Sequence, residues 1–483
     1  MVQLNRDIIL MILEQLKDDK PSLRCCLLVN RTWCEITTPM LWKTLGRKRL
    51  PDNVKTKLFN VIISHLSEDS KGILKEQGID TEDYGPPLFN YISLWRHLNL
   101  RLLDDMIYLR KTKDSNMNII RNEIYKLFIN KNSKFISLFI PAKLEIQIDN
   151  FPDADKCFSF LELFKCDSSI KKPILIGMSN IITSIKKITI ENLYHGKIVN
   201  SGFDKLIKAQ KNLKQVCLLG DSKKKNEISL EDLLKNNVNH IQHINLGWNP
   251  NTEFLSHFAN LISLKIYMKS NNLENNHFHL KSLNLPNIKY LKISGVPVEI
   301  LADMIDNSGG HLVEINIKET NDRLIKSIYK KCKNLKYLEL SIENKNLLEF
   351  ENLLINCKYL CGLVIDNDSS IDINSLFEIL CNSSPVGLYK FKFAYYAKFN
   401  LEPLESFFKD WDKRHPMLLK LNTFWMKKAL QSQKLYREIC NIVERYKSKG
   451  TVRKIEFLDC DNFLEDIDSL EWLKKKSRLY REY

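Results

Sequence analysis

A short apolar motif that recurs along most of the chain constrains its fold more than any other feature. The segments CKNLKYLEL (332–340) and CKYLCGLVI (357–365) align at a spacing of 25 residues, and both contain L-x-x-L-x-L or its aliphatic equivalent. Eleven such triplets, at spacings of 20 to 28 residues, run from Phe135 to Phe393. Between them, apolar residues at i, i+3 and i+4 predict helices that cover one side of a strand layer. The sequence therefore predicts a stack of strand–helix repeats.

The period and the motif resemble those of leucine-rich repeats, in which a short parallel strand alternates with a helix on the outer face. The resemblance implies an α/β fold over residues 135–460: a right-handed solenoid with parallel strands inside and helices outside. Residues 46–134 are predicted to be a helical linker and N-terminal cap, and residues 461–483 a C-terminal cap with a basic tail. Caps are expected because an end repeat would otherwise expose the continuous core.

Three cysteines recur in step with the repeats. Cys332, Cys357 and Cys381 are predicted to end successive outer helices, at spacings of 25 and 24 residues. They resemble the cysteine-containing subclass of leucine-rich repeats. We interpret them as small buried hydrophobic residues with reduced thiols, because equivalent positions lie one repeat apart and no paired C-x2-C ligands occur. We therefore predict no metal site.

The first 45 residues predict a separate all-α module of three helices. Apolar residues at helical spacing indicate a first helix that begins near Arg6: Ile8, Ile9, Ile12, Leu13 and Leu16. Pro21 suits the first turn of a second helix, where its missing N–H costs nothing. Asn30 suits the N-cap of a third helix, which we expect to end before Pro39. Trp33 and Trp42 are predicted to close the core of this small module.

These residues resemble the F-box, the adaptor-binding module of SCF-type ubiquitin ligases, through the helix DIILMILEQL, the segment LVNRTW and the segment PMLW. The family usually places proline after the first leucine, where this chain has Asn5, a residue that can cap the first helix. The resemblance implies that the module contacts a Skp-type adaptor, and through it a cullin-RING ligase. The implied contact residues are Leu4, Ile8, Ile9, Ile12, Leu13, Leu16, Val29 and Leu41.

No motif in the sequence predicts catalysis or a bound cofactor. The chain lacks G-x-x-x-x-G-K-[ST] and H-E-x-x-H, and the segment GMSNI (177–181) lacks the last glycine of a nucleophile elbow. We therefore predict a binding protein without a cofactor, not an enzyme. The apolar run from Ile8 to Leu13 is too short for a signal peptide or membrane span, so we expect an intracellular protein in the cytoplasm, the nucleus or both.

The predicted strands also locate a recognition surface. Residues that flank the second and third apolar positions of each triplet are expected on the concave face, where exposed aromatic side chains serve as anchors. The predicted target-binding residues are Lys265, Tyr267, Tyr290, Lys292, Tyr337 and Glu339. Over all such positions there are six lysines and five acidic residues, so the predicted concave face is nearly neutral. The net charge of +15 therefore comes mainly from short basic runs elsewhere, at 43–49, 223–225 and 474–478.

The F-box resemblance implies the substrate-recognition subunit of an SCF-type E3 ligase, which docks on the adaptor and presents an unidentified target protein on the repeats. Two alternatives remain open on sequence grounds. In one, the chain is a scaffold for protein–protein interaction whose N-terminal helices only cap the repeats. In the other, which the near-neutral concave face disfavours, it is a basic nucleic-acid binder.

Overall fold

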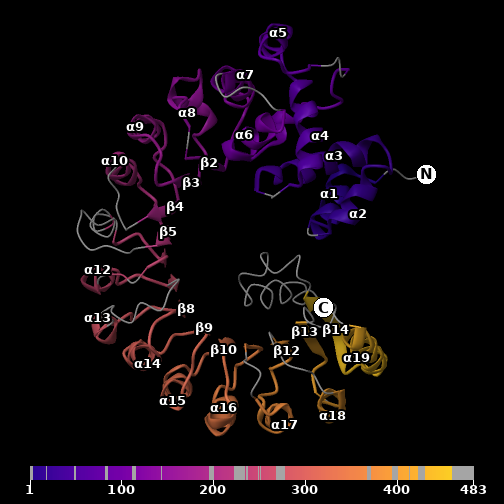
Figure 1. The fold of residues 1–483 in the computed structure, drawn as a ribbon, viewed down its shortest axis with the longest axis vertical. Helices are drawn as coiled ribbons and strands as arrows, with labels where there is room; N and C mark the ends of the chain where they lie inside the picture. The colour runs from indigo at the N-terminus through magenta and orange to yellow at the C-terminus, as the bar shows by residue number, and fades with distance from the viewer. Residues whose placement is uncertain are drawn as a thin grey trace. The chain divides into compact units, whose positions relative to one another are not determined.

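Parallel strands alternate with helices through both units of the protein (Figure 1). The computed structural model describes residues 4–17, 19–47, 50–81, 85–110, 116–142, 144–194, 201–221, 234, 238–248, 250, 252–267, 278–366, 371–393, 401–412, 414–422 and 430–458. It divides the chain into unit 1, Met1–His240, and unit 2, Ile241–Tyr483. This boundary falls inside the array predicted for residues 135–460. The predicted tail, 461–483, and the basic run 223–225 lie outside the described residues.

Unit 1 begins with helices and continues with five strands, each of which pairs in parallel with the next. Its helices are α1 (Arg6–Gln15), α2 (Lys20–Cys26), α3 (Arg31–Trp42), α4 (Asp52–Ile63), α5 (Glu68–Glu76), α6 (Leu100–Tyr108), α7 (Met117–Phe128), α8 (Ala154–Cys157), α9 (Lys172–Ile181) and α10 (Gly202–Lys208). Its strands are β1 (His97–Asn99), β2 (Ser137–Ile140), β3 (Leu163–Asp167), β4 (Lys187–Tyr194) and β5 (Gln215–Asp221).

Unit 2 continues the same pattern, and its strands β6 to β14 also pair in parallel in chain order. The strands are β6 (His243–Leu246), β7 (Ser263–Tyr267), β8 (Tyr290–Ser294), β9 (Glu314–Ile317), β10 (Tyr337–Leu340), β11 (Gly362–Ile365), β12 (Lys390–Phe393), β13 (Met417–Asn422) and β14 (Val452–Leu458). The helices are α12 (Thr252–Ser256), α13 (Phe278–Lys281), α14 (Val298–Asp306), α15 (Asp322–Lys331), α16 (Leu347–Asn356), α17 (Ile373–Ser383), α18 (Leu401–Asp410) and α19 (Leu430–Ser448).

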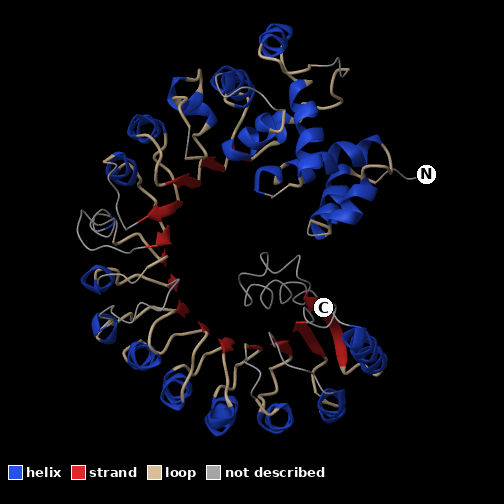
Figure 2. Ribbon diagram, viewed as in Figure 1, coloured by secondary structure: helices blue, strands red, loops and turns tan. Residues whose placement is uncertain are grey.

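The helices of the repeats lie on one side of the strands in each unit, and the core fills the space between them (Figure 2). We call the other side of the strands the strand face. In β10 and β11 the register places Leu338 beside Leu363 and Leu340 beside Ile365, and all four side chains are fully buried. The alternation of strand residues thus sends the motif leucines into the core, and the predicted leucine-rich-repeat fold is confirmed.

Ten of the eleven predicted triplets have the correct register, and the triplet at β3 is wrong. We predicted Phe158, Leu161 and Leu163, but Leu163 is only half-buried. Phe164 and Cys166 are buried instead, and they lie beside Leu138 and Ile140 of β2. The β3 motif therefore begins at Leu161, three residues later than predicted.

The first strand of the array precedes the predicted start at residue 135, since β1 pairs with β2. The 3₁₀ helix η1 (Leu45–Arg47) packs against this strand. A Cβ atom on Gly46 would lie 1.8 Å from the backbone oxygen of His97, so only glycine fits there. Asn99 donates its side-chain N–H to the Gly46 carbonyl at 3.1 Å. These contacts join the N-terminal helices to the first repeat.

His97 makes this junction sensitive to acid. Burial, reinforced by Arg47 and Lys43, lowers the pKa of the imidazole to about 4, from an ordinary value near 6.5. Below pH 6.5 the His97 imidazole becomes protonated in the unfolded chain but stays neutral in the folded chain. The free energy of unfolding therefore decreases as the pH falls towards 4. From pH 7 to 4.5 we expect His97 to remove about 2 kcal/mol from the free energy of unfolding.

Urea titrations of the unaltered chain and of a His97→Gln variant at these two pH values would measure the effect. The variant is expected to lose less stability than the unaltered chain over this interval. Parallel pH dependences for the two proteins would show that folding does not lower the pKa of His97.

Candidate protein-interaction sites

The three N-terminal helices, α1 to α3, form a small core of their own. Its buried members are Ile9, Leu13, Leu23 and Cys26, and these partly buried residues pack against them: Leu16, Trp33, Ile36, Met40 and Leu41. The prediction that Ile9 and Leu13 contact the adaptor is therefore wrong, because both side chains are at most 1% exposed. Leu16 and Leu41 also pack towards this core.

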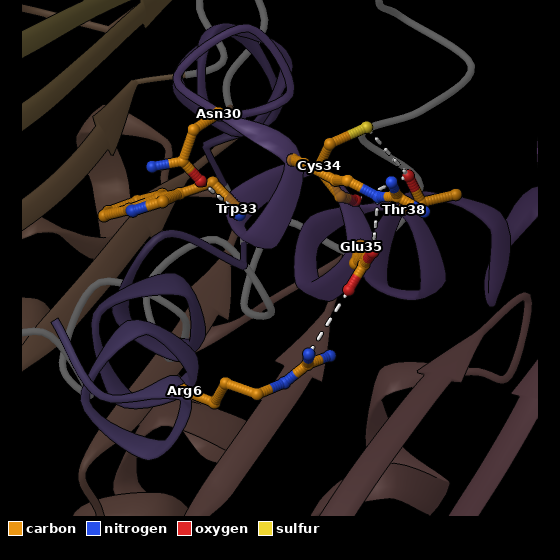
Figure 3. A network of polar contacts seen from close by, with 7 residues as sticks. Arg6, Asn30, Trp33, Cys34, Glu35 and Thr38 are labelled. Atoms are coloured by element: carbon orange, nitrogen blue, oxygen red, sulfur yellow. Dashed lines mark hydrogen bonds and ion pairs between the residues drawn. The ribbon is translucent and has the colours of Figure 1, made fainter. Parts of the chain in front are cut away.

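Side-chain caps define where these helices begin. The Asn5 side-chain oxygen accepts a hydrogen bond from the Asp7 backbone N–H at 3.3 Å, and the Asp19 carboxylate accepts one from the Ser22 backbone N–H at 3.2 Å. Asn30 accepts a hydrogen bond from Trp33 N–H at 3.0 Å (Figure 3). Asn5 thus caps α1 as predicted, in the position where the F-box family usually has proline, and Asn30 caps α3 as predicted.

Glu35 ties the first helix to the third. Its carboxylate lies 3.2 Å from Arg6 of α1 (Figure 3). It also lies 3.1 Å from Arg31 of α3. An exposed ion pair contributes at most about 1 kcal/mol, so this contact fixes orientation more than it adds stability. The core residues remain the main source of cohesion in the module.

The predicted end of the third helix at Pro39 is wrong. Helix α3 continues to Trp42, with Pro39 inside it, and Lys43 N–H donates to the Pro39 carbonyl at 2.9 Å. The Thr38 hydroxyl donates to the Cys34 carbonyl at 2.7 Å in the same turn. The extension carries Met40 and Leu41 onto the module core, and this packing overrides the local preference of proline.

The two tryptophans have different roles, although we predicted one shared role. Trp33 packs on the module core as predicted. Trp42 instead stacks on Tyr91, with ring centroids 4.3 Å apart and an interplanar angle of 25°. Trp42 thus joins the module to the following segment of unit 1, next to the short helix η2 (Ile92–Leu94).

One face of α1 exposes apolar side chains that the module core does not use. Ile8, Met11 and Ile12 fall on one side of the helix by their spacing, and Leu4 precedes the helix; the exposed fractions of these four side chains lie between 38% and 67%. Of these, Met11 was missing from the predicted contact set. The helical period could have found it, because Met11 lies three residues after Ile8 and on the side away from Leu13.

Two further apolar residues are exposed in the turn between α2 and α3. Leu28 is 86% exposed and Val29 is 58% exposed. Val29 belongs to the predicted contact set, and Leu28 does not. Exposed apolar residues that gather on one small module indicate a protein-binding surface more strongly than single exposed leucines elsewhere. We call Leu4, Ile8, Met11, Ile12, Leu28 and Val29 the module's apolar set.

The strand face of unit 2 carries the predicted target-binding residues. Lys265 and Tyr267 lie on β7, Tyr290 and Lys292 on β8, and Tyr337 and Glu339 on β10. The Lys292 ammonium lies 5.6 Å from the centroid of the Tyr267 ring. The three tyrosines are half-buried, so each presents part of its ring.

Burial separates Lys292 and Glu339 from the other predicted target contacts. Each is only 7% exposed, and the Glu339 carboxylate accepts a hydrogen bond from the Asn316 side chain. Both residues therefore present only a small part of their side chains on the strand face, and their predicted role in target binding stays a prediction. The triplet predicted for β3 also placed Phe164 on the concave face, because Phe164 follows Leu163. It points into the core instead, because of the register at β3.

The strand face is more basic at β12 and β13 than predicted. Lys390 and Lys392 of β12 and Lys420 of β13 are nearly inaccessible to solvent, and Lys392 lies directly beside Lys420. The Lys390 ammonium lies 5.5 Å from the Tyr337 ring centroid and 5.1 Å from that of Tyr389. Burial lowers the pKa of Lys390 to about 8. The predicted charge balance missed Lys420, because β13 lies beyond the last complete triplet.

Two of the three cysteines of the outer helices lie where the repeats predicted. Cys332 and Cys357 follow the last residues of α15 and α16, and both are fully buried. Burial raises the pKa of each thiol to about 12. Cys381 lies within α17 instead of ending it, and is only partly buried. All the described cysteines are free thiols.

Within the described ranges, no group of three or more His, Cys, Asp or Glu side chains could hold a metal ion. Over the same part of the chain, no helix combines the length and the apolar character needed to cross a membrane.

Comparisons with known proteins add a distant structural likeness. No protein-family model matches the chain, and no curated protein matches it. Among solved structures, it is similar to the leucine-rich repeat-containing protein LegL7 from Legionella pneumophila. The two share 15% sequence identity at a TM-score of 0.38, over 62% of this chain and 91% of that one. The leucine-rich-repeat fold of this chain therefore follows from its own parallel strands, buried motif leucines and covering helices.

Proposed function

We propose that the chain is the substrate-recognition subunit of an SCF-type ubiquitin ligase, in which α1 to α3 bind a Skp-type adaptor and the repeats bind a target protein. The observation that carries the proposal is the apolar set of the module. Three short helices with four buried core residues are close to the smallest core that is stable, yet this module exposes the six apolar side chains of this set and Leu10 as well.

The resemblance to the F-box favours a Skp-type adaptor as the partner of the apolar set. The cap at Asn30 and the packing of Trp33 support this proposal, and Asn5 caps α1 where the family usually has proline. Helix α1 presents Ile8, Met11 and Ile12 at i, i+3 and i+4, a pattern that is suited to an apolar groove on a partner. In this proposal, ubiquitin-transfer chemistry belongs to the cullin-RING partners, and the chain contributes by holding the target near the charged enzyme.

The strand face of unit 2 is the proposed target site. It combines tyrosines with lysines on neighbouring parallel strands, about 5 Å apart, so one epitope can contact several of them. Tyr267, Tyr290 and Tyr337 supply aromatic surface, the residue type that most often dominates binding energy. The lysines favour an acidic or polar target segment.

Binding of a purified Skp-type adaptor tests the adaptor proposal. We expect the full-length chain to bind it in biolayer interferometry, and to bring a cullin-RING complex to the sensor in a second step. A chain that begins at residue 46 is expected to bind no adaptor. If neither chain binds the adaptor while both unfold cooperatively, the module is a cap and the protein is a scaffold for other interactions.

A further inference from the structure

One edge of the strand layer in unit 2 carries exposed lysines and no acidic residue. Strands β8 to β12 are parallel, so the loops that lead into them lie at the same edge. These five loops, 282–289, 307–313, 332–336, 357–361 and 384–389, contain no aspartate or glutamate. We call the exposed lysines of these loops and of the end of α15 the basic edge: Lys289, Lys330, Lys331, Lys333, Lys336 and Lys358.

Helix ends explain only part of this charge. Lys330 and Lys331 lie in the last turn of α15, where the helix dipole favours a cation. The Lys333 ammonium donates to a backbone carbonyl of the same turn at 2.8 Å. Lys289 and Lys336 instead lie directly before strands β8 and β10, away from the helix ends, so the helix dipole does not explain them.

The opposite edge of the same strands is balanced in charge. The loops that leave β9 and β10, 318–321 and 341–346, hold two lysines and two glutamates. One lysine and one glutamate of these loops, Lys345 and Glu343, form an ion pair at 2.6 Å. At the basic edge, the acidic residue that precedes loop 307–313 is Asp306, which ends α14 and accepts a hydrogen bond from the Ser327 hydroxyl at 3.1 Å. The excess of lysine is therefore a property of one edge.

Backbone hydrogen bonds hold these lysines in register from repeat to repeat. The Val313 N–H donates to the Lys289 carbonyl, and the Lys336 N–H donates to the Val313 carbonyl, both at 2.9 Å. Lys289 and Lys336 are thus two strand spacings apart, about 10 Å. Lys333 and Lys358 each follow the buried cysteine after a helix, so they occupy equivalent positions in adjacent repeats. A polypeptide that runs across the repeats can contact these lysines in turn.

Exposed apolar side chains border the basic edge. Ile355 of α16 is 54% exposed, and Tyr359, in the loop after α16, is 61% exposed. Val386, in the loop that leads into β12, is 91% exposed. A hydrogen bond from the Tyr389 N–H to the Cys361 carbonyl, at 3.4 Å, joins that loop to loop 357–361. Aliphatic side chains have no complement in a phosphate backbone, so their presence favours a protein partner over a nucleic acid.

We propose that the basic edge, together with Ile355, Tyr359 and Val386, binds a second protein through an extended segment that mixes acidic with large apolar residues. The carboxylates of the segment pair with the lysines, and its apolar side chains pack on the three exposed apolar residues. The site uses none of the residues proposed for adaptor or target binding. This inference therefore goes beyond the proposed function and stands even if both of those proposals fail.

Fluorescence anisotropy with defined peptides tests the site on the full-length chain. A peptide of about ten residues is long enough, because β8 to β12 span about 20 Å and ten extended residues reach up to about 35 Å. The mixed probe alternates glutamate with leucine, and it is expected to bind. A peptide with lysine in place of glutamate is expected not to bind, and one with serine in place of leucine is expected to bind at least about threefold more weakly.

Reversing the charge of the basic edge is expected to weaken binding of the mixed probe at least about tenfold. The charge-reversed variant carries three substitutions: Lys333→Glu, Lys336→Glu and Lys358→Glu. A matched control makes the same change in net charge at three exposed lysines of unit 1: Lys57→Glu, Lys75→Glu and Lys205→Glu. The control should bind the probe as tightly as the unaltered chain. Equal affinities of the two variants would overturn the proposal.

Zero-length carbodiimide crosslinking of the unaltered chain to the mixed probe decides the question even if a variant fails to fold. The reagent joins only carboxylates and amines that touch, so mass spectrometry is expected to find links at Lys289, Lys333, Lys336 or Lys358. Links confined to lysines outside the basic edge would overturn the proposal. Tighter binding of a single-stranded RNA of about ten nucleotides, with loss of that binding in the charge-reversed variant, would assign the edge to nucleic acid and overturn it as well.

Discussion

Replacing Ile8 and Met11 together with glutamate is expected to abolish adaptor binding and to leave the protein folded. Both side chains are substantially exposed, at 46% and 67%, so glutamate remains solvated in the free protein. In a complex, the two carboxylates would be buried against apolar surface without partners. We expect a loss of at least about 100-fold in affinity for a Skp-type adaptor, or about 3 kcal/mol, measured by biolayer interferometry.

Two matched variants serve as controls for this experiment. Leu348→Glu changes an apolar residue of α16 that is 69% exposed, and it should keep full adaptor affinity. Leu13→Glu places a carboxylate in the module core, so it should lower the melting temperature as well as the affinity. If the Ile8 and Met11 double variant binds as tightly as the unaltered chain, the adaptor does not use this face of α1.

The first helix shows why sequence alone could not separate contact residues from core residues. Six consecutive apolar residues, from Ile8 to Leu13, surround the helix on every side. A period of 3.6 residues then identifies a helix but does not select which face is buried. The buried face is determined by packing against α2 and α3. This packing buries Ile9 and Leu13. It leaves Ile8, Met11 and Ile12 exposed.

The strands were more predictable, because each motif has one apolar pattern that fits. At β3 two patterns overlap, since the sequence from Phe158 to Phe164 offers apolar residues at most positions. The predicted register of β3 omits Cys166, which is fully buried and completes the correct triplet. Counting cysteine as a small apolar residue would have favoured the observed register.

The strand face was the least predictable part of the protein. Alternation identifies which residues point away from the helices, and it correctly placed Lys265, Tyr267 and Tyr290 there. It says nothing about what covers that face, so the burial of Lys390 and Lys392 could not be predicted. Burial of a surface depends on contacts between segments distant in sequence, which no local pattern encodes.

Aspartate in place of Leu338 is expected to be the most destabilising single change in unit 2. Leu338 is fully buried between Ile315 of β9 and Leu363 of β11. The substitution removes leucine packing in three adjacent repeats and buries a carboxylate without a partner. We expect a loss of about 4 kcal/mol or more in the free energy of unfolding, and faster hydrogen exchange at the amides of β9, β10 and β11.

Leu348→Asp is the matched control, because it makes the same chemical change ten residues away on the exposed side of α16. Its effect is expected to stay within about 0.5 kcal/mol, as for surface substitutions in general. Since the repeats stack as nearest neighbours, damage from Leu338→Asp should also fade with distance, and the amides of β6 should stay protected. Equal destabilisation by both variants, or equal hydrogen exchange in all strands of unit 2, would contradict the burial of Leu338 in a core shared by neighbouring repeats.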